Sequence, residues 1–238
     1  MKKRLDVLLA EKKLVASRSQ AESYIRLGKV KVDGTAATKP GQLVNIEAKV
    51  TIAAGEQYVS RAALKLQSAD EAFSIDWQNK TVLDVGSSTG GFTEYALKHG
   101  ASKVFAVDVG TNQLHPSLRQ DPRISLHEKT DIRKFVTKEH IDIVVGDVSF
   151  ISLRDILPHV ATIISPDTKV IAMVKPQFEA GVSNVKHKGV IKNDRMRRDI
   201  LKDFEQWSKQ RFIIHDKTDS KVAGSKGNVE RFYLMSLV

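Results

Sequence analysis

Hydrophobic and polar positions follow two different patterns along the chain, and the pattern changes near Tyr58. From there onward, short apolar runs alternate with amphipathic stretches of helical period, as in a parallel sheet with helical crossovers. The strands predicted from these runs are residues 81–85, 103–108, 123–128, 142–147, 169–175, 211–215 and 229–236. The predicted helices are residues 60–73, 92–98 and 194–209. Because the last two strands have no helix between them, we expect an α/β fold whose seven-stranded sheet is mostly parallel.

The residues before Tyr58 predict a smaller α+β unit. The leucine spacing over residues 4–14 indicates an amphipathic helix. A second helix is expected to begin at Ser17, which forms a capping box with Gln20, and to end at Gly28. Two apolar runs bounded by turn residues predict short strands at residues 29–32 and 43–46.

The charge of the chain is concentrated in this first part. The formal net charge is +10, and residues 1–54 carry +6 of it. Such a field attracts polyanions such as nucleic acid, although a solvated basic surface that aids solubility has the same composition. Pattern and charge together predict three parts of the chain, which are a small domain at residues 1–54, a linker at 55–59 and a large domain at 60–238.

Composition narrows the class of protein further. The chain has no run of eighteen apolar residues, and its charged N-terminus lacks the apolar stretch of a secretory signal. It contains no cysteine, which excludes disulfides and thiolate metal sites. The histidines show no ligand spacing, so no metal site is expected; those considered are His115, His127, His187 and His215. A cytoplasmic protein with no stable membrane partner is the expectation, and no feature sets an oligomeric state.

The stretch Val82–Phe92, Val-Leu-Asp-Val-Gly-Ser-Ser-Thr-Gly-Gly-Phe, carries the first candidate chemistry. An apolar strand runs into a Gly-rich turn and then a helix, whose free N–H groups face a ligand. A Walker loop would require Gly-Lys-Ser/Thr, and a dinucleotide site would require G-x-G-x-x-G; neither is present. Asp84 before the turn also disfavours a pyrophosphate, because its charge would repel one. A turn without any ligand is the remaining alternative.

A nucleoside cofactor with a positive centre fits this turn better, and S-adenosylmethionine is such a cofactor. Asp108 ends the next predicted strand, where an acid holds ribose hydroxyls in nucleoside-binding folds. Asp131, after the third strand, lies where such sheets contact adenine, or is an ordinary acid in a surface turn. The predicted cofactor-binding residues are Asp84, Gly86, Ser88, Thr89, Gly90, Gly91, Phe92, Asp108 and Asp131.

The small domain resembles the S-four type RNA-binding domain, named for a ribosomal small-subunit protein. The resemblance covers Ser17–Gly34, with the pattern R-S-x-A-x-x-x-I-R-x-G-x-V-x-V-D-G. Because the segment has no aromatic run for base stacking, we expect it to recognise RNA shape and backbone. The predicted RNA-binding residues are Lys3, Arg4, Arg18, Gln20, Arg26, Lys29 and Lys31. The basic segment Lys186–Lys192 either flanks an RNA channel or is a solvated loop.

Over almost its whole length, the chain resembles the hemolysin A-type (TlyA) family of ribosomal RNA 2'-O-methyltransferases. The motifs are Tyr58-Val-Ser-Arg-Ala-Ala-Leu-Lys-Leu66, Asp84-Val-Gly-Ser-Ser-Thr-Gly-Gly-Phe92, Asp147-Val-Ser-Phe-Ile-Ser-Leu153, Lys175-Pro-Gln-Phe-Glu-Ala-Gly181 and Gly227-Asn-Val-Glu230. The resemblance implies a class I Rossmann-like, FtsJ-like catalytic domain. It also implies methyl transfer from S-adenosylmethionine to a ribose 2'-hydroxyl, on cytidine of the large-subunit and in some members also the small-subunit RNA. Ribosomal RNA or a ribosomal subunit is the implied partner.

The family's Lys-Asp-Lys-Glu tetrad maps onto Lys65, Asp147, Lys175 and Glu230. Asp147 and Lys175 end predicted strands at the carboxyl edge, where open α/β sheets bind ligands. Lys175 is expected to take the proton of the 2'-hydroxyl, its pKa lowered by nearby positive charge, while the two acids orient the lysines. Taken alone, Lys65 is better explained as an exposed helix residue and Glu230 as an ordinary strand-edge acid.

Two departures from the family pattern are visible beside the tetrad. Ala62-Ala63 replaces a more usual glycine pair, and Arg231 stands where an apolar residue is common. Arg231 is therefore expected to alter the local field. Two other functions remain as alternatives: a membrane-active hemolysin, as the family name suggests, and a non-catalytic RNA-binding factor for ribosome assembly.

Overall fold

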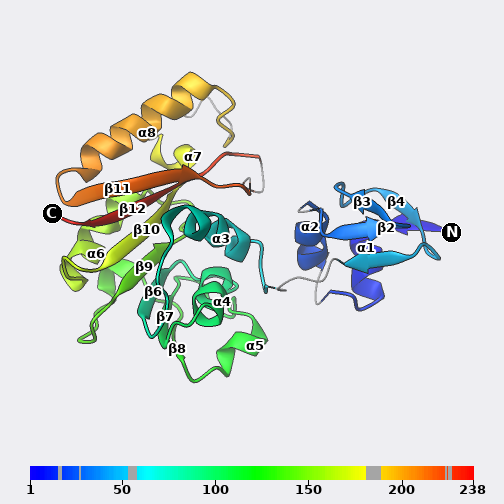
Figure 1. Ribbon diagram of the computed structural model, residues 1–238, viewed down its shortest axis with the longest axis horizontal. Helices are drawn as coiled ribbons and strands as arrows, with labels where there is room; N and C mark the ends of the chain where they lie inside the picture. Colours follow the sequence, from blue (N-terminus) through cyan, green and yellow to red (C-terminus); the bar gives the residue numbers. More distant parts are fainter. Residues whose placement is uncertain (16–17, 27, 53–57, 181–188, 223, 225–226) are drawn as a thin grey trace. The chain divides into compact units, whose positions relative to one another are not determined.

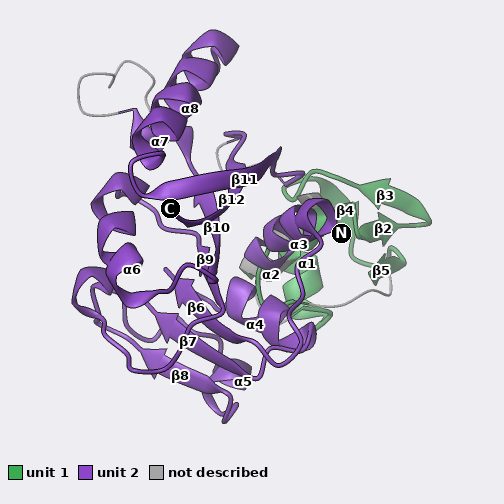
Figure 2. Ribbon diagram, turned by 60° about the vertical axis from the view of Figure 1, so that its left-hand side comes forward, with its two compact units in different colours: residues 1–61 green, residues 62–238 purple. Residues whose placement is uncertain are grey.

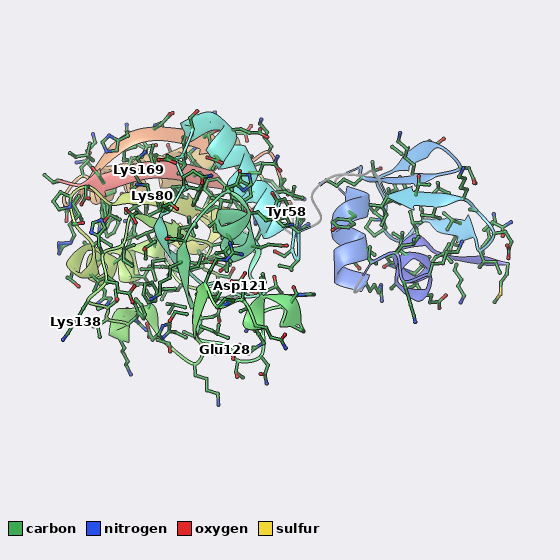
Figure 3. The ribbon with its side chains drawn as sticks, turned by 60° about the horizontal axis from the view of Figure 1, so that its bottom comes forward. Tyr58, Lys80, Asp121, Glu128, Lys138 and Lys169 are labelled. Atoms are coloured by element: carbon green, nitrogen blue, oxygen red, sulfur yellow. The ribbon has the colours of Figure 1, made fainter. Side chains whose placement is uncertain are left out.

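The computed structural model describes residues 1–15, 18–26, 28–52, 58–180, 189–222, 224 and 227–238. The chain divides into two compact units, Met1–Arg61 and Ala62–Val238 (Figure 2). Residues 55–57 of the expected linker and residues 186–188 of the basic segment Lys186–Lys192 lie outside the described residues. Tyr58, labelled in Figure 3, is buried, and its carbonyl oxygen accepts a hydrogen bond from the Tyr24 hydroxyl at 3.5 Å.

The first unit contains two helices and five three-residue strands within its described part. Their bounds are β1 (Lys2–Arg4), α1 (Leu5–Glu11), α2 (Arg18–Arg26), β2 (Val30–Val32), β3 (Thr35–Ala37), β4 (Leu43–Asn45) and β5 (Val50–Ile52). Strand β1 pairs antiparallel with β4, and β2 lies between β3 and β5. The leucines of α1 pack with Ile25 and Val30 into one core. Lys31 alternates with the core valines and is exposed, as the period-two pattern predicted.

The first helix is shorter than the leucine spacing predicted. Arg4, which was expected to begin the helix, is instead the last residue of strand β1, because the backbone of β1 pairs with β4 about forty residues further along the chain. The helix ends at Glu11, and Lys13 adopts a left-handed backbone conformation with φ 54°. Strands β1, β3 and β5 were not predicted, since three residues are too few to show a periodicity.

The second unit is built on a seven-stranded sheet with the order β11-β12-β10-β9-β6-β7-β8 (Figure 1). The strand bounds are β6 (Thr81–Val85), β7 (Lys103–Val107), β8 (Ile124–His127), β9 (Ile143–Gly146), β10 (Lys169–Val174), β11 (Phe212–Asp219) and β12 (Arg231–Leu237). Strands β6 to β10 are parallel, whereas β12 runs antiparallel to both β10 and β11. This is the predicted mostly parallel sheet of a Rossmann-like fold.

Helices cover both faces of this sheet. Their bounds are α3 (Ala62–Phe73), α4 (Gly91–Lys98), α5 (Pro116–Arg119), η1 (Ile132–Lys134), η2 (Leu153–Asp155), α6 (Leu157–Ile163), α7 (Pro176–Glu179) and α8 (Asp194–Ser208). On one face, Leu83 and Val85 of β6 join α6 and α8 in the main core. Because side chains alternate along a strand, Asp84 points to the opposite face, where α4 packs on β6 and β7.

Strand β11 extends further than the apolar pattern indicated. The prediction ended it at residue 215, whereas the strand continues to Asp219, which pairs with Arg231 of β12. The added residues are polar and lie on an edge strand, and a register shift interrupts the ladder between Ile214 and Asp216. An exposed edge strand needs no apolar alternation, so its sequence carries little signal.

Candidate active site

Two adjoining cavities open at the carboxyl edge of the central strands. The larger measures about 470 Å³ and the smaller about 150 Å³. The residues that line both are Gly86, Ser88, Asp147 and Ser149. The larger volume lies in the range of small-molecule sites, and the position is the one at which open α/β sheets bind their ligands.

Asp84 is fully buried on the floor of the smaller cavity. Its Oδ2 accepts a hydrogen bond from the Thr93 hydroxyl of α4 at 2.6 Å, whereas Oδ1 has no hydrogen-bond partner among the described residues. Burial, with smaller contributions from the charges of Asp147 and Asp108, raises the pKa of Asp84 to about 7. An unpaired carboxylate oxygen in this position is suited to a cationic ligand.

Asp108 follows β7 and lines the larger cavity. Its two oxygens accept backbone hydrogen bonds, Oδ2 from Ser88 N at 2.8 Å and Oδ1 from Gly110 N at 2.7 Å. These bonds tie the turn after β6 to the end of β7, with Ser88 in a left-handed conformation at φ 46°. Each carboxylate oxygen retains a second lone pair, so the group can still accept hydrogen bonds from ribose hydroxyls.

Asp131 lines the same larger cavity but is also part of the local turn structure. It caps η1 through the backbone N–H of Arg133, and it forms an ion pair with the Arg133 guanidinium at 2.6 Å. These hydrogen bonds lower the pKa of Asp131 to about 2. Both interpretations of this residue, an adenine contact and a turn acid, are therefore compatible with its position.

Two positions in the turn after β6 require glycine for different structural reasons. Gly86 has φ 81°, and a Cβ there would lie 3.2 Å from Val148 and 3.3 Å from the carbonyl oxygen of Asp147, so the close approach of the loops after β6 and β9 requires glycine. At Gly90, with φ 93°, a Cβ would overlap Leu118 at 2.4 Å and Leu114 at 2.7 Å. The left-handed backbone and the packing of these two leucines therefore both explain glycine at position 90, and its predicted role at the cofactor stays a prediction.

Most of the predicted cofactor-binding residues meet around the two cavities. Those that line one or both are Asp84, Gly86, Ser88, Thr89, Phe92, Asp108 and Asp131. Gly90 and Gly91 lie beside the site and line neither cavity. Phe92 also packs on Phe232 of β12, with ring centroids 6.2 Å apart.

Lys175 lies directly after β10 and lines the smaller cavity. Its Nζ is 2.6 Å from Asp147 Oδ1, and it donates a hydrogen bond to Ser149 Oγ at 2.7 Å. The Lys175 side chain is 9% exposed and that of Asp147 is 16% exposed, so this ion pair is largely removed from water. The ring centroid of Phe178 is 5.9 Å from Nζ, at the limit of a cation–π contact.

Lys65 and Glu230 form a second buried ion pair. Lys65 Nζ donates a hydrogen bond to Glu230 Oε2 at 2.5 Å, and the two side chains are 8% and 3% exposed. This burial rules out the interpretation of Lys65 as an exposed helix residue. The ladder between β10 and β12 ends with the pair Val174 and Arg231, so Lys175 and Glu230, the next residue of each segment, both lie at this end of the ladder.

Arg231 forms an ion pair outside the tetrad. Its Nε lies 2.6 Å from Asp219 Oδ1 on β11, and Arg197 of α8 contacts the same oxygen at 2.6 Å. Because side chains alternate along β12, Arg231 points away from Glu230. Asp219 offsets part of the charge of the two arginines, and the effect of Arg231 on the field at the tetrad stays a prediction.

The sequence patterns missed several residues at this edge. Ser149 lies inside a recognised motif, but only the fold brings it to Lys175. Phe150 is 92% exposed, lines the larger cavity and has φ 66°, a conformation that non-glycine residues rarely adopt. Glu179 of α7 is buried and accepts hydrogen bonds from Ser152 Oγ at 2.6 Å and Leu153 N at 2.7 Å. Positive φ at Phe150 and the long-range bonds of Glu179 leave no local sequence signal.

Three of the predicted RNA-binding cations in the first unit are engaged in ion pairs. Lys3 Nζ lies 2.7 Å from Glu11, while Arg4 and Arg18 both contact the buried carboxylate of Asp6, at 2.9 and 2.8 Å. These contacts, of which the hydrogen bond from Arg4 has the largest effect, hold the pKa of Asp6 well below its usual range. The side chains of Gln20 and Arg26 lie outside the part that the structure describes. Lys29 is half-buried, and Lys31 is exposed.

Neither a membrane-crossing helix nor a cluster of metal-binding side chains occurs among the described residues. Among them, no helix combines the length and the apolar character that a membrane crossing requires. The same residues contain no group of three or more metal-binding side chains.

Comparison with known proteins gives matches to both units. A family model described as FtsJ-like methyltransferase matches residues 58–237, and one described as S4 domain matches residues 3–50. The 16S/23S rRNA (cytidine-2'-O)-methyltransferase TlyA of Mycobacterium tuberculosis (strain ATCC 25618 / H37Rv) is 39% identical over 235 residues, which cover 96% of this chain and 88% of that protein. The 23S rRNA (cytidine-2'-O)-methyltransferase TlyA of Campylobacter jejuni is 44% identical over 181 residues, or 75% of this chain and 70% of that protein.

A solved structure is also similar. It is that of a Streptococcus thermophilus protein that carries the name hemolysin, and it is 34% identical with a TM-score of 0.76. The match covers 100% of this chain and 89% of that chain.

Proposed function

The chain belongs to the FtsJ-like methyltransferase family, as its motifs predicted, and from this premise we propose that it methylates the ribose 2'-oxygen of a cytidine in ribosomal RNA. The observation that carries the chemistry is the buried Lys175–Asp147 pair at the mouth of the smaller cavity. The nucleotide type comes from the names of the TlyA relatives. Ribosomal RNA as substrate would place the activity in the cytoplasm.

The acids of the two cavities fit S-adenosylmethionine as the methyl donor. When bound, this cofactor supplies a methyl group activated by a sulfonium sulfur. Asp84, with an unpaired buried oxygen, would hold a cationic group, and Asp108 would accept hydrogen bonds from the ribose hydroxyls. Asp131 borders the same cavity on the side of the expected adenine site.

Lys175 is the proposed general base. The 2'-oxygen would take the methyl group as the methyl–sulfur bond of the donor breaks, and its proton would move to the lone pair of Lys175, which would act as a neutral amine and become an ammonium beside Asp147. The charge of Asp147 stabilises that ammonium. The Lys65–Glu230 pair, at the same end of the β10–β12 ladder as Lys175, fixes Glu230 at this edge. Much of the rate is expected to come from alignment of the reacting groups.

Phe150 is a candidate platform for the base of the target nucleotide. It is almost fully exposed, and it stands next to Ser149 at the rim of the larger cavity. Its ring lies 5.3 Å from that of Phe178, which leaves the outer face open to solvent. Proteins that read unpaired RNA commonly stack a base on such a ring.

The first unit is the proposed RNA-docking module. Its S4 domain match, its excess of positive charge and the exposed Lys31 support contacts with RNA phosphates. Arg4 and Arg18, held by Asp6, remain about half-exposed and can use their other N–H groups for phosphates.

A transfer experiment tests this function. Purified protein would be incubated with tritiated S-adenosylmethionine and unmodified ribosomal subunits, and the product nucleoside would be identified by mass spectrometry. We expect one 2'-O-methylcytidine per target subunit. Label on a base atom, or no label on either subunit, would refute the proposal.

A further inference from the structure

We propose that Ser149 is a positioning residue whose hydroxyl orients the Lys175 amine, so that the lone pair of the base faces the ribose 2'-oxygen. The inference rests on the proposed function, because it assigns a role in the same reaction. The inference concerns the direction in which the lone pair of Lys175 Nζ points, which the charge of Asp147 alone does not set.

The contacts at Nζ differ in kind. Lys175 Nζ lies within 2.7 Å of both Asp147 Oδ1 and Ser149 Oγ, but only the contact with Ser149 has hydrogen-bond alignment among the described residues. The carboxylate therefore supplies charge, and the hydroxyl supplies direction. A hydrogen bond loses most of its strength when it is misaligned, so the aligned bond dominates the orientation of the group.

Orientation matters because a neutral amine has two N–H bonds and a single lone pair. Rotation about the Cε–Nζ bond carries that lone pair around a cone, and only part of the cone faces the substrate. An acceptor that holds one N–H selects a narrow part of this rotation, and the neighbouring carboxylate attracts the other N–H. The lone pair is then left in one direction before the substrate binds, which is a form of preorganisation.

The fold explains why Ser149 reaches Lys175. Strands β9 and β10 are parallel, with Gly146 in register with Ala172. Ser149 and Lys175 each lie three residues further along, so both leave the sheet at the same level of its carboxyl edge. Ser149 lines both cavities, and Lys175 lines the smaller one. The hydroxyl therefore stands at the junction where the methyl donor and the ribose must meet.

Variants of Ser149 separate this role from others. We expect Ser149→Ala to lower kcat about 10- to 100-fold, within the range of general-base effects, and to leave the cofactor Kd and the RNA KM within about twofold. Ser149→Thr, which retains an acceptor hydroxyl, should recover most of the lost kcat. Calorimetry would supply the cofactor Kd, and single-turnover methyl transfer would supply the rate.

Ser152→Ala is the matched control, because it removes a hydroxyl from the same loop without touching Lys175. Ser152 anchors the loop to Glu179, so displacement of the loop would lower kcat at least as much in Ser152→Ala as in Ser149→Ala. We expect the larger loss in Ser149→Ala. The inference would be overturned if Ser149→Ala and Ser152→Ala lost kcat equally, or if Ser149→Ala kept the wild-type kcat. It would also be overturned if Ser149→Ala changed only the cofactor Kd, or if Ser149→Thr did not recover kcat. Absence of transfer by the wild type would instead refute the proposed function itself.

Discussion

At the scale of single residues, Asp84 links the site to pH. Its carboxyl group has a pKa of about 7 in the folded protein, raised from an ordinary value of 3.8 chiefly by burial. Between pH 3.8 and about pH 7, Asp84 keeps its proton in the folded protein but has lost it in the unfolded chain. The stability associated with that proton is therefore present at low pH and is lost as the pH rises through about 7.

Cofactor binding should depend on pH in the opposite sense. A cationic ligand beside Asp84 favours the ionised carboxylate, so affinity for S-adenosylmethionine should increase about eightfold from pH 6 to pH 7.5. Calorimetry at the two pH values would measure it. Asp84→Asn should bind weakly, with little pH dependence, and should unfold at a higher temperature than the wild type at pH 8. An unchanged pH dependence in Asp84→Asn would show that another group is responsible.

The Lys65–Glu230 pair allows structure and chemistry to be separated. Glu230→Leu alone leaves Lys65 buried without its partner and should cost about 3–5 kcal/mol in the free energy of unfolding. The double variant Lys65→Met with Glu230→Leu should restore most of that loss in urea denaturation, because two apolar side chains can pack together. Methyl transfer should remain at least about 100-fold reduced in the double variant. Recovery of activity along with stability would mean that the pair is only structural.

At the scale of elements, α7 and η2 hold the active-site loop. Glu179, the last residue of α7, binds the N-terminus of η2 through Leu153 N and Ser152 Oγ. The loop between Asp147 and Ser152 carries Ser149 and Phe150, so its two ends are fixed by β9 and by Glu179. Burial raises the pKa of Glu179, while these hydrogen bonds favour its ionised form.

Loss of this connection should be measurable as a loss of stability. Glu179→Ala leaves a buried backbone N–H without its acceptor and should lower the free energy of unfolding by about 1–3 kcal/mol. Glu179→Gln keeps one acceptor oxygen and should lose less. The control is Glu139→Ala, which removes an exposed pair with Lys103 and should change stability by less than about 1 kcal/mol. Equal effects at Glu139 and Glu179 would contradict a stabilising role for the hydrogen bonds of Glu179.

The same elements show what the sequence can and cannot predict. The buried strands β6, β9 and β10 were predicted to within about two residues, because continuous apolar runs mark strands covered on both faces. Asp147 and Lys175 were predicted as site residues because each one directly ends such an apolar run. Strands β1, β3 and β5 were missed because each is three residues long and formed by distant pairing.

Side-chain contacts across the sequence could not be predicted. Lys65 and Glu230 are 165 positions apart, and only the family resemblance associated them. Ser149 and Glu179 were not selected, since neither a loop serine nor a glutamate at the end of a short helix has a local pattern that predicts its partner. The reason for glycine at Gly90 also depends on α5, whose side chains pack against it.

At the scale of the whole molecule, charge is divided between the units. The first unit contributes a large part of the positive charge, while the cavities of the second are lined by acids. This division suits a protein that attracts a polyanion with one part and holds a cationic cofactor with the other. Affinity for RNA and affinity for the cofactor should therefore respond to different variants.

Lys31→Ala tests this separation. It removes an exposed cation on β2, and it should weaken rRNA binding and reduce the slope of log K against log salt by about one. The cofactor Kd should not change. Lys169→Ala is the control, since Lys169, labelled in Figure 3, is an exposed cation of the second unit at the amino end of β10. An equal loss of RNA binding in both variants would argue against a specific role for the first unit.

The most direct measurement compares methyl transfer by two lysine variants of one strand. Lys175→Met removes the proposed base at the carboxyl end of β10, and Lys169→Met makes the same change at its amino end. Both would be incubated with tritiated S-adenosylmethionine and unmodified ribosomal subunits. We expect Lys169→Met to label the ribose 2'-oxygen at the wild-type rate, and Lys175→Met to bind the cofactor but transfer at least about 100-fold more slowly. Wild-type transfer by Lys175→Met would contradict the account.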